Sequence, residues 1–320
     1  MRSPAADPSP DATATTTATT TATTTGTASK AGSPLIPAPL TPVPRAEAFR
    51  RACRYEWRHL AGLRSTWVLL GVAAVLSLLT GITVLLDVDA GEPPMSAAAA
   101  ADVVTWAPLA TQVPALCFFL LVLGTGPVST DLVRGAARTT WLAVNGRGTA
   151  YAAKCLVGFL VGAATAAAGA LLGSLSSALV LAASGAAQPE WDRVVVPALR
   201  FGLWMGCWAL LCLALVSLIR SRIVPVLFLC MWPLIVERLL GGLVGRIPGL
   251  DGIGGLLPFA AGRAMLTDVS AYPADDRPFA RALVGSDLAT APATGLFCLY
   301  TVLIAAAGCW AYCRRDAKSG

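Results

Sequence analysis

Long runs without charged residues decide what this chain can fold into. The apolar runs cover residues 67–86, 108–128, 152–183, 201–219, 223–244 and 292–313. About 20 residues of helix cross the ~30 Å hydrocarbon core of a bilayer, and helices are preferred there because lipid offers the backbone no hydrogen-bond partners. The sequence therefore predicts an all-α polytopic membrane protein with six transmembrane helices.

Composition agrees with this class. Only 13% of the residues are charged, against about 25% in soluble domains. Eight of the nine cysteines lie inside or at the edges of apolar runs, and no CxxC pair occurs. We expect these cysteines to act as small buried hydrophobes, with neither a disulfide framework nor a metal site.

Three segments differ in character. Residues 1–44 are rich in Thr, Ala and Pro, have almost nothing to bury, and are expected to be a disordered tail. Residues 45–65 should form a basic amphipathic helix along the membrane surface. The six spans then lie within a single domain, 66–316.

The amphipathic pattern of residues 45–65 rests on a regular apolar stripe. Phe49, Cys53, Trp57 and Leu60 recur at the spacing of one helix face. Most of the nearby basic residues lie off this stripe, namely Arg50, Arg51, Arg54 and Arg58.

Basic residues give the spans a direction. Lys and Arg concentrate before the first run, between the second and third, between the fourth and fifth, and after the last. The loop 87–107 has none and carries four acidic residues instead. The positive-inside rule therefore predicts a plasma-membrane protein with both termini in the cytoplasm.

The long outer segment 245–291 begins with an apolar stretch. Residues 247–261 are too short to cross the membrane and contain several Gly and Pro residues. This pattern predicts a re-entrant or interfacial pair of short helices before the last span. The remainder, with its Asp275 and Asp276, is expected to be solvated.

Catalytic motifs are missing from the sequence. The single histidine is His59, which rules out HExxH, and it lies in the segment before the first span, which argues against a Ser-His arrangement within the membrane. Neither GxSxG nor the phosphate-binding GxxxxGK[ST] occurs. We therefore expect the chain not to be an enzyme.

Glu237 is the most informative ionisable residue, because it lies in the outer third of the fifth run. A carboxylate is costly at that depth unless it is paired or wet. One interpretation is a polar contact in a translocation pathway or outer gate. The other is that Glu237 snorkels, or pairs with Arg238 or Arg246.

The loop 129–151 is the second informative stretch. Asp131 can cap a short helix on which Arg134, Arg138 and Trp141 share roughly one face. Such a helix suits docking onto a soluble partner, although its charges could equally serve only to fix topology.

Pairs of glycines spaced four apart allow helices to approach closely in lipid. They serve either packing within the chain or a subunit or gating interface. The pairs are Gly158/Gly162, Gly169/Gly173, Gly202/Gly206 and Gly241/Gly245.

Several short motifs occur in an order that resembles a known family. Glu56-Trp57 and then Leu63-Arg64-Ser65-Thr66-Trp67 open the first span, and the loop 130–148 leads to Lys154. Leu256-Leu257-Pro258-Phe259 precedes the last span, and Arg314-Arg315-Asp316 follows it. Over about 46–316, the chain resembles type-2 ABC transporter permeases of the actinobacterial kind. It departs from them at Asp131, where glutamate is more usual, and at Asn145-Gly146-Arg147, where a proline-containing turn is more usual.

This resemblance implies the membrane-spanning permease half of an ATP-driven exporter. It would work with a second permease copy or paralogue and two copies of an ATP-binding subunit, in the lipid bilayer and without nucleic acid. No cofactor is expected in this chain, since ATP and magnesium would bind the partner ATPase. The two other functions considered are a secondary transporter without an ATPase and a non-transporting assembly or sensor protein.

The resemblance also gives roles to particular residues. Residues 45–65 would be the connecting helix, with Phe49, Trp57 and Arg58. The ATPase-coupling helix would carry Asp131, Arg134, Arg138 and Trp141. The outer gate or pathway would include Glu237, Pro258 and Phe259.

Overall fold

The computed structural model describes most of the chain after the Thr-rich tail. The described residues are 44–87, 95–105, 114, 116–118, 120–121, 125, 146–219, 221, 223–250 and 252–314. Within these ranges the chain is helical or in turns and contains no strand, which confirms the all-α class. Residues 1–43, most of the second apolar run and most of the loop 129–151 lie outside the described ranges.

Five described helical segments are long and apolar enough to cross a membrane, so the chain is a multi-pass membrane protein by length and composition. They are α2 (Arg64–Asp87), α6 (Arg147–Ser184), α7 (Trp191–Leu218), the continuous segment Ile223–Val244, and α12 (Thr290–Arg314). These five correspond to the first, third, fourth, fifth and sixth predicted spans.

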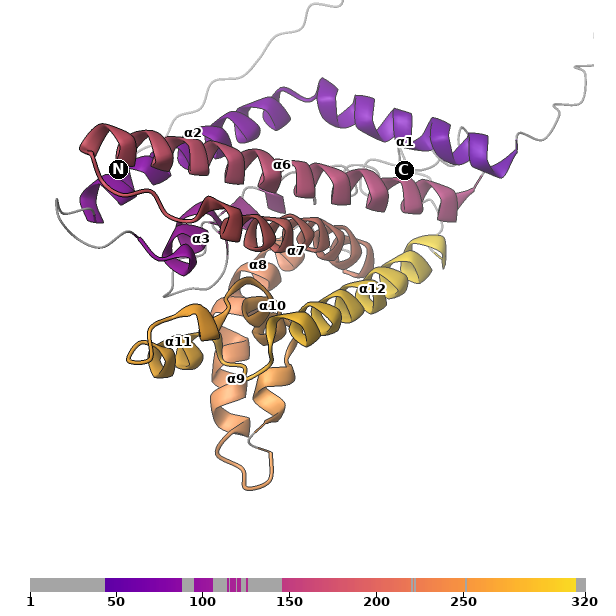
Figure 1. Cartoon of the computed structure of the whole chain (residues 1–320). Coiled ribbons are helices and arrows are strands. Elements are labelled where there is room, and N and C mark those ends of the chain that lie inside the picture. The colour runs from indigo at the N-terminus through magenta and orange to yellow at the C-terminus, as the bar shows by residue number, and fades with distance from the viewer. Residues whose placement is uncertain are drawn as a thin grey trace, which may run out of the picture. The chain divides into compact units, whose positions relative to one another are not determined.

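Helix α6 contacts both of its long neighbours, α2 on one side and α7 on the other, and α7 in turn contacts α12 (Figure 1). Glycines make these contacts close. A Cβ at Gly162 would lie 2.6 Å from the carbonyl oxygen of Met205 on α7, and one at Gly173 would lie 3.2 Å from Oγ1 of Thr80 on α2. At these positions the small residues serve packing within the chain.

Two spans differ from their predicted bounds. Helix α6 runs unbroken from Arg147 to Ser184, so it begins five residues before the predicted start at 152. Helix α7 begins at Trp191, well before the predicted start at 201, and holds Pro197 inside it. The charges of Arg193 and Arg200 interrupt the apolar run without ending the helix.

The fifth span has an irregular middle. It consists of α8 (Ile223–Met231), a π-helical turn η1 (Trp232–Val236) and α9 (Glu237–Val244). The backbone N–H of Glu237 donates to the carbonyl of Trp232, five residues back. Such turns are often found at functional sites.

The short elements are only partly as expected. In the region where a re-entrant or interfacial pair was predicted, the structure has the 3₁₀ turn η2 (Ile253–Leu256) and the helix α10 (Pro258–Leu266), which extends beyond the predicted end at 261. Two helices were not predicted: α3 (Ala97–Thr105) in the loop 87–107, and α11 (Arg277–Val284) in the segment expected to be solvated. Alanine, the best helix former, supplies the first five residues of α3.

An aromatic cluster joins α7, α10 and α12. The rings of Trp204 and Trp208 stack with centroids 5.0 Å apart, and Trp204 also stacks on Phe297 at 5.8 Å. Phe259 of α10 completes the cluster, 5.9 Å from Trp208 and 6.4 Å from Phe297. Offset aromatic pairs of this kind contribute about 0.5–1.5 kcal/mol each beyond their buried area, so they hold α10 against the spans.

Candidate functional site

The candidate site is built where α10 begins. Pro258 is the first residue of this helix and has no N–H, and the preceding Leu257 offers no capping side chain. The next two N–H groups therefore need acceptors from elsewhere. Glu237 of α9 supplies both: its Oε2 accepts from Phe259 N at 3.0 Å, and its Oε1 accepts a short bond from Ala260 N.

The Glu237 carboxylate is almost wholly buried, with 1% of the residue exposed. Burying a charge without partners would cost several kcal/mol. The positive end of the α10 dipole and its free N–H groups are the partners that favour an anion there. Glu237 is thus a cap for α10 provided by a different helix.

Arg263 is the cation of the site. Its Nη2 lies 3.7 Å from Oε1 of Glu237, its Nε donates to the carbonyl of Val284 at 2.9 Å, and its Nη1 donates to the carbonyl of Pro233 at 3.1 Å. Burial lowers the pKa of Arg263 to about 10, and the Glu237 charge opposes that shift. The guanidinium therefore remains charged at neutral pH and bridges α10, the π turn and the end of α11.

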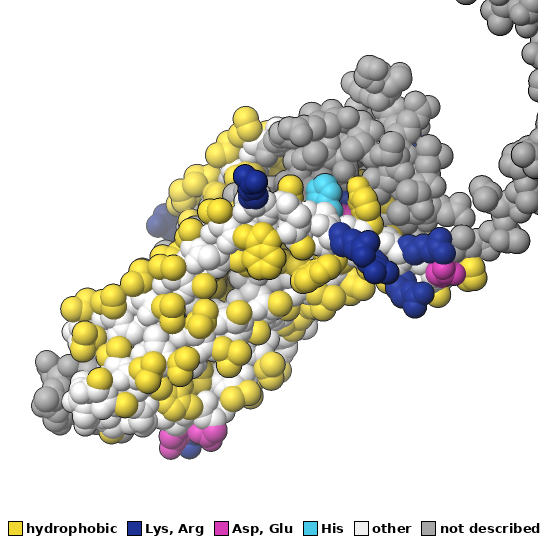
Figure 2. Space-filling model, turned by 90° about the horizontal axis from the view of Figure 1, so that it is seen from above, with side chains coloured by type: hydrophobic (Ala, Val, Ile, Leu, Met, Phe, Trp, Pro, Cys, Tyr) yellow, Lys and Arg dark blue, Asp and Glu magenta, His cyan; other side chains and the backbone are white. Residues whose placement is uncertain are grey.

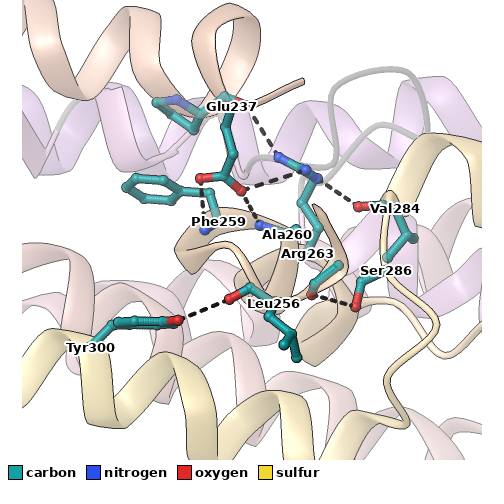
Figure 3. A network of polar contacts seen from close by, with 10 residues as sticks. Glu237, Leu256, Phe259, Ala260, Arg263, Val284, Ser286 and Tyr300 are labelled. Carbon is teal, nitrogen blue, oxygen red and sulfur yellow. Dashed lines mark hydrogen bonds and ion pairs between the residues drawn. The ribbon is translucent and has the colours of Figure 1, made fainter. Parts of the chain in front are cut away.

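Two further hydrogen bonds fasten the turn before α10 (Figure 3). Ser286 Oγ donates to the carbonyl of Gly255 at 2.8 Å, and Tyr300 OH donates to the carbonyl of Leu256 at 3.0 Å. Together with Glu237 and Arg263, these contacts connect α9, α10, α12 and the turn after α11. We call this set the α10 network.

The three residues assigned to an outer gate do come together. Pro258 starts α10, Phe259 donates its N–H to Glu237, and the Phe259 ring enters the aromatic cluster. The ion-pair partner that the structure shows for Glu237 is Arg263, instead of the sequence neighbours Arg238 or Arg246. Sequence reasoning missed Arg263, although it is the only charge in the apolar stretch Pro258–Leu266.

A polar cavity of about 580 Å³ lies beside this network, between α3, the start of α7 and the end of α10. Its lining includes Asp102, Arg193, Arg200 and Tyr272. Tyr272 OH donates a short hydrogen bond to Asp102. Burial raises the pKa of Asp102 to about 6, and the bond from Tyr272 opposes the shift.

A second buried pair holds α1 (Arg45–Gly62) to α6. Lys154 Nζ donates to Oε1 of Glu56 at 2.6 Å, and both side chains are about 95% buried. Around this pair Ala52 of α1 packs on Ala150 and Ala153 of α6. Sequence reasoning placed Glu56 and Lys154 in separate motifs and did not connect them.

This packing corrects the predicted face of the surface helix. Its fully buried positions are Ala48, Ala52 and Glu56, one step away from the predicted stripe. Phe49 lies half-buried against α6, whereas Trp57 and Arg58 are exposed. The face of α1 toward α6 carries small residues and an acid because the two helices meet closely, with Phe49 and Cys53 at its edge, and Trp57 is the exposed member of the predicted stripe.

The remaining predicted site residues lie outside the described ranges. These are Asp131, Arg134, Arg138 and Trp141 of the loop 129–151. Near the described end of that loop, Arg147 Nη1 donates to the carbonyl of Cys313 at 2.9 Å, which holds the start of α6 to the end of α12.

No cluster suited to a metal ion occurs among the described residues, and all nine cysteines are unpaired. Comparison of the chain with protein-family models, curated proteins and solved structures gives no match.

Proposed function

We propose that this chain is the membrane-spanning subunit of an ATP-driven exporter of the type-2 ABC class. In this proposal it lies in the plasma membrane with both termini in the cytoplasm, pairs with a second permease chain, and works with two copies of an ATP-binding subunit. The motif order along the chain and the five described span-length helices support it.

The direction of the helices favours six spans. Gly169 of α6 lies opposite Ser77 of α2, and Gly173 lies opposite Thr80, so the two helices run parallel. Two parallel spans need a return crossing between them, which the run 108–128 can supply. In that run, Cys117 is buried and its carbonyl accepts a 3.0 Å bond from Trp208 Nε1, which is consistent with a place inside the bundle.

The observation that carries the proposal is the buried Glu56–Lys154 pair. It fixes a surface helix to the first turns of the span that follows the loop 129–151. In a transporter driven from the cytoplasm, a partner that pushes on this loop would move α6 and α1 together. Separating the two helices would leave the charges of Glu56 and Lys154 buried without each other, which is costly. A movement of the loop would thus be transmitted to the transmembrane helices through the contact between α1 and α6.

The α10 network would form the outer end of the pathway. Both oxygens of Glu237 already accept backbone N–H groups, and Arg263 lies beside them. We therefore assign Glu237 the role of holding the outer gate. A proton- or ion-carrying carboxylate, as a secondary transporter would need, should have a free oxygen facing a pathway.

The test is co-purification with an ATPase. The full chain is expressed with a GxxxxGK[ST] protein encoded beside it, purified by a tag on the permease, and assayed for bound ATPase and its ATP turnover. We expect R134A, R138A and W141A to weaken the complex, because these residues would seat in the partner. The control R246A, at an exposed position after α9, should not. If no ATPase is retained from the native membrane under any condition, the proposal is wrong.

A further inference from the structure

An apolar cavity lies where α1, α2 and α6 meet, away from the α10 network. Its volume is about 270 Å³, close to the lower limit of ~300 Å³ that is typical of ligand pockets. Trp57 of α1, Trp67 and Leu70 of α2, and Ala164 and Ala168 of α6 are among its lining residues. Since Trp57, Trp67, Ala164 and Ala168 are exposed, the cavity opens on the outside of the bundle.

The described surface of α1, α2 and α6 carries exposed apolar side chains as well as basic ones. Figure 2 shows hydrophobic side chains over much of the described face, with several basic side chains gathered toward the end that carries the histidine. Leu160 and Leu171 of α6 and Val68 of α2 are more than half exposed there. A face of this kind in a membrane protein is covered by acyl chains.

Two arginines lie close in sequence to residues that line the cavity. Arg58 follows Trp57, and Arg64 precedes Thr66; both arginines are exposed and form no ion pair with a described residue. Thr66 also lines the cavity, is 5% exposed, and has a hydroxyl with no hydrogen-bond partner among the described residues. The site thus combines an apolar lining and one buried hydroxyl without a described partner with two exposed cations that lie near its lining residues in sequence.

We propose that this cavity binds an anionic phospholipid. One acyl chain occupies the space between α2 and α6, and the phosphate lies against Arg58 and Arg64. Trp57 and Trp67 flank the lipid at the depth where aromatic residues favour the membrane–water boundary. The charge of the α1 arginines suits the anionic lipids of a cytoplasmic leaflet, and this leaflet assignment rests on the proposed orientation.

A second copy of the chain is a poorer occupant than a lipid. A two-fold interface brings the same patch of both copies together. On this face it would set the exposed arginines of one α1 against those of the other, Arg54 and Arg58 among them. Like charges at an interface cost several kcal/mol, whereas a phosphate is attracted.

Native mass spectrometry of the full-length protein tests the proposal. The protein is purified in detergent, delipidated, and titrated with phosphatidylglycerol or with phosphatidylcholine of the same acyl chains. We expect phosphatidylglycerol to bind more tightly. R58Q and R64Q should each weaken its binding about fivefold, the usual contribution of one basic residue near a membrane surface, whereas R45Q, at the far end of α1, should not.

A cavity-filling pair of variants separates binding in the cavity from binding at the surface. Ala168 lines the cavity, whereas the adjacent exposed Ala167 does not. We expect A168F to reduce bound phosphatidylglycerol at least fivefold relative to A167F, with both variants matching the wild type in helix content. Equal lipid binding by the two variants, or equal affinity for the two lipids, would overturn the proposal. So would an A168F variant that changes the dimer fraction while lipid binding stays intact.

Discussion

Two buried acid–base pairs among the described residues are built differently. At the α1 end, Lys154 and Glu56 meet directly at 2.6 Å, side chain to side chain. At the α10 end, Glu237 and Arg263 are 3.7 Å apart, and each makes shorter hydrogen bonds to backbone groups. The first pair joins two helices through a direct contact between side chains. In the second pair, each charged side chain makes its shorter hydrogen bonds to backbone groups, and the contact between the two charges is longer.

This difference predicts how well each pair tolerates replacement by apolar residues. When both members of a direct pair are replaced by apolar side chains, neither charge is left buried without the other. Replacing both Glu237 and Arg263 by apolar residues leaves backbone groups unpaired instead. The N–H groups of Phe259 and Ala260 would then remain buried without acceptors. The α10 end should therefore be the less tolerant of the two.

The largest effect is expected for E237A. It removes the acceptors of two buried N–H groups and leaves Arg263 charged and buried, so the free energy of unfolding should fall by about 4 kcal/mol. Unfolding in mixed detergent micelles, followed by circular dichroism, measures this. E190A is the matched control, since Glu190 is 61% exposed in its pair with Arg193 and should change stability by less than about 1 kcal/mol. Equal losses for the two variants would show that Glu237 is not the cap of α10.

The second prediction tests replacement of the direct pair. K154M leaves the Glu56 carboxylate buried without its cation and should destabilise the protein by about 3 kcal/mol. The double variant E56M/K154M should recover most of that loss, to within about 1 kcal/mol of the wild type. The corresponding double variant E237M/R263M should recover little. If both double variants recover equally, the contrast between the two ends is wrong.

The third prediction concerns the contact between α6 and α7. In G162A the new Cβ would meet the Met205 carbonyl oxygen at 2.6 Å, so α6 and α7 must separate, at a cost of about 2 kcal/mol. Gly71 of α2 has no atom within 4 Å of such a Cβ. G71A is therefore the control and should be neutral or slightly stabilising, because alanine favours a helix by about 1 kcal/mol over glycine. An unchanged melting temperature for G162A would contradict the close contact.

Hydropathy predicted most of the bundle because lipid leaves the backbone few choices. Long apolar runs must become helices, and the bounds of the fifth and last spans follow closely from the sequence. The start of α7 was missed because the charges of Arg193 and Arg200 end the apolar run in a hydropathy profile. In the structure both residues line a cavity within the helical part of the chain. The helix α11 was missed because its charged residues make the segment look solvated. The apolar face that it buries consists of only two residues, Ala280 and Val284.

The candidate site was predictable only in part, since its contacts join distant residues. Glu237 stood out because a carboxylate in an apolar run needs a partner, and Pro258 marked a helix start. The connection between Glu237 and Phe259 depends on how the chain turns after α9, which local pattern does not specify. The same applies to Glu56 and Lys154, which lie 98 residues apart. The available signal was an acidic residue, Glu56, in one helix and a basic residue, Lys154, in another. Each suggested that it needed a partner of opposite charge.

The smallest effect is expected at the polar cavity beside the α10 network, and it depends on pH. The pKa of Asp102 is raised by burial to about 6 in the folded chain, from an ordinary value of 3.8. Between these values the folded state holds a proton that the unfolded state releases, so stability falls as pH rises from about 4 to about 6 and is level above that. We expect a fall of about 1 kcal/mol, since the cavity is open to water. D102N should abolish this slope. Y272F should steepen it, because the hydrogen bond from Tyr272 opposes the rise in pKa. Melting temperatures across this pH range decide the matter, and a slope that survives in D102N would place the titrating group elsewhere.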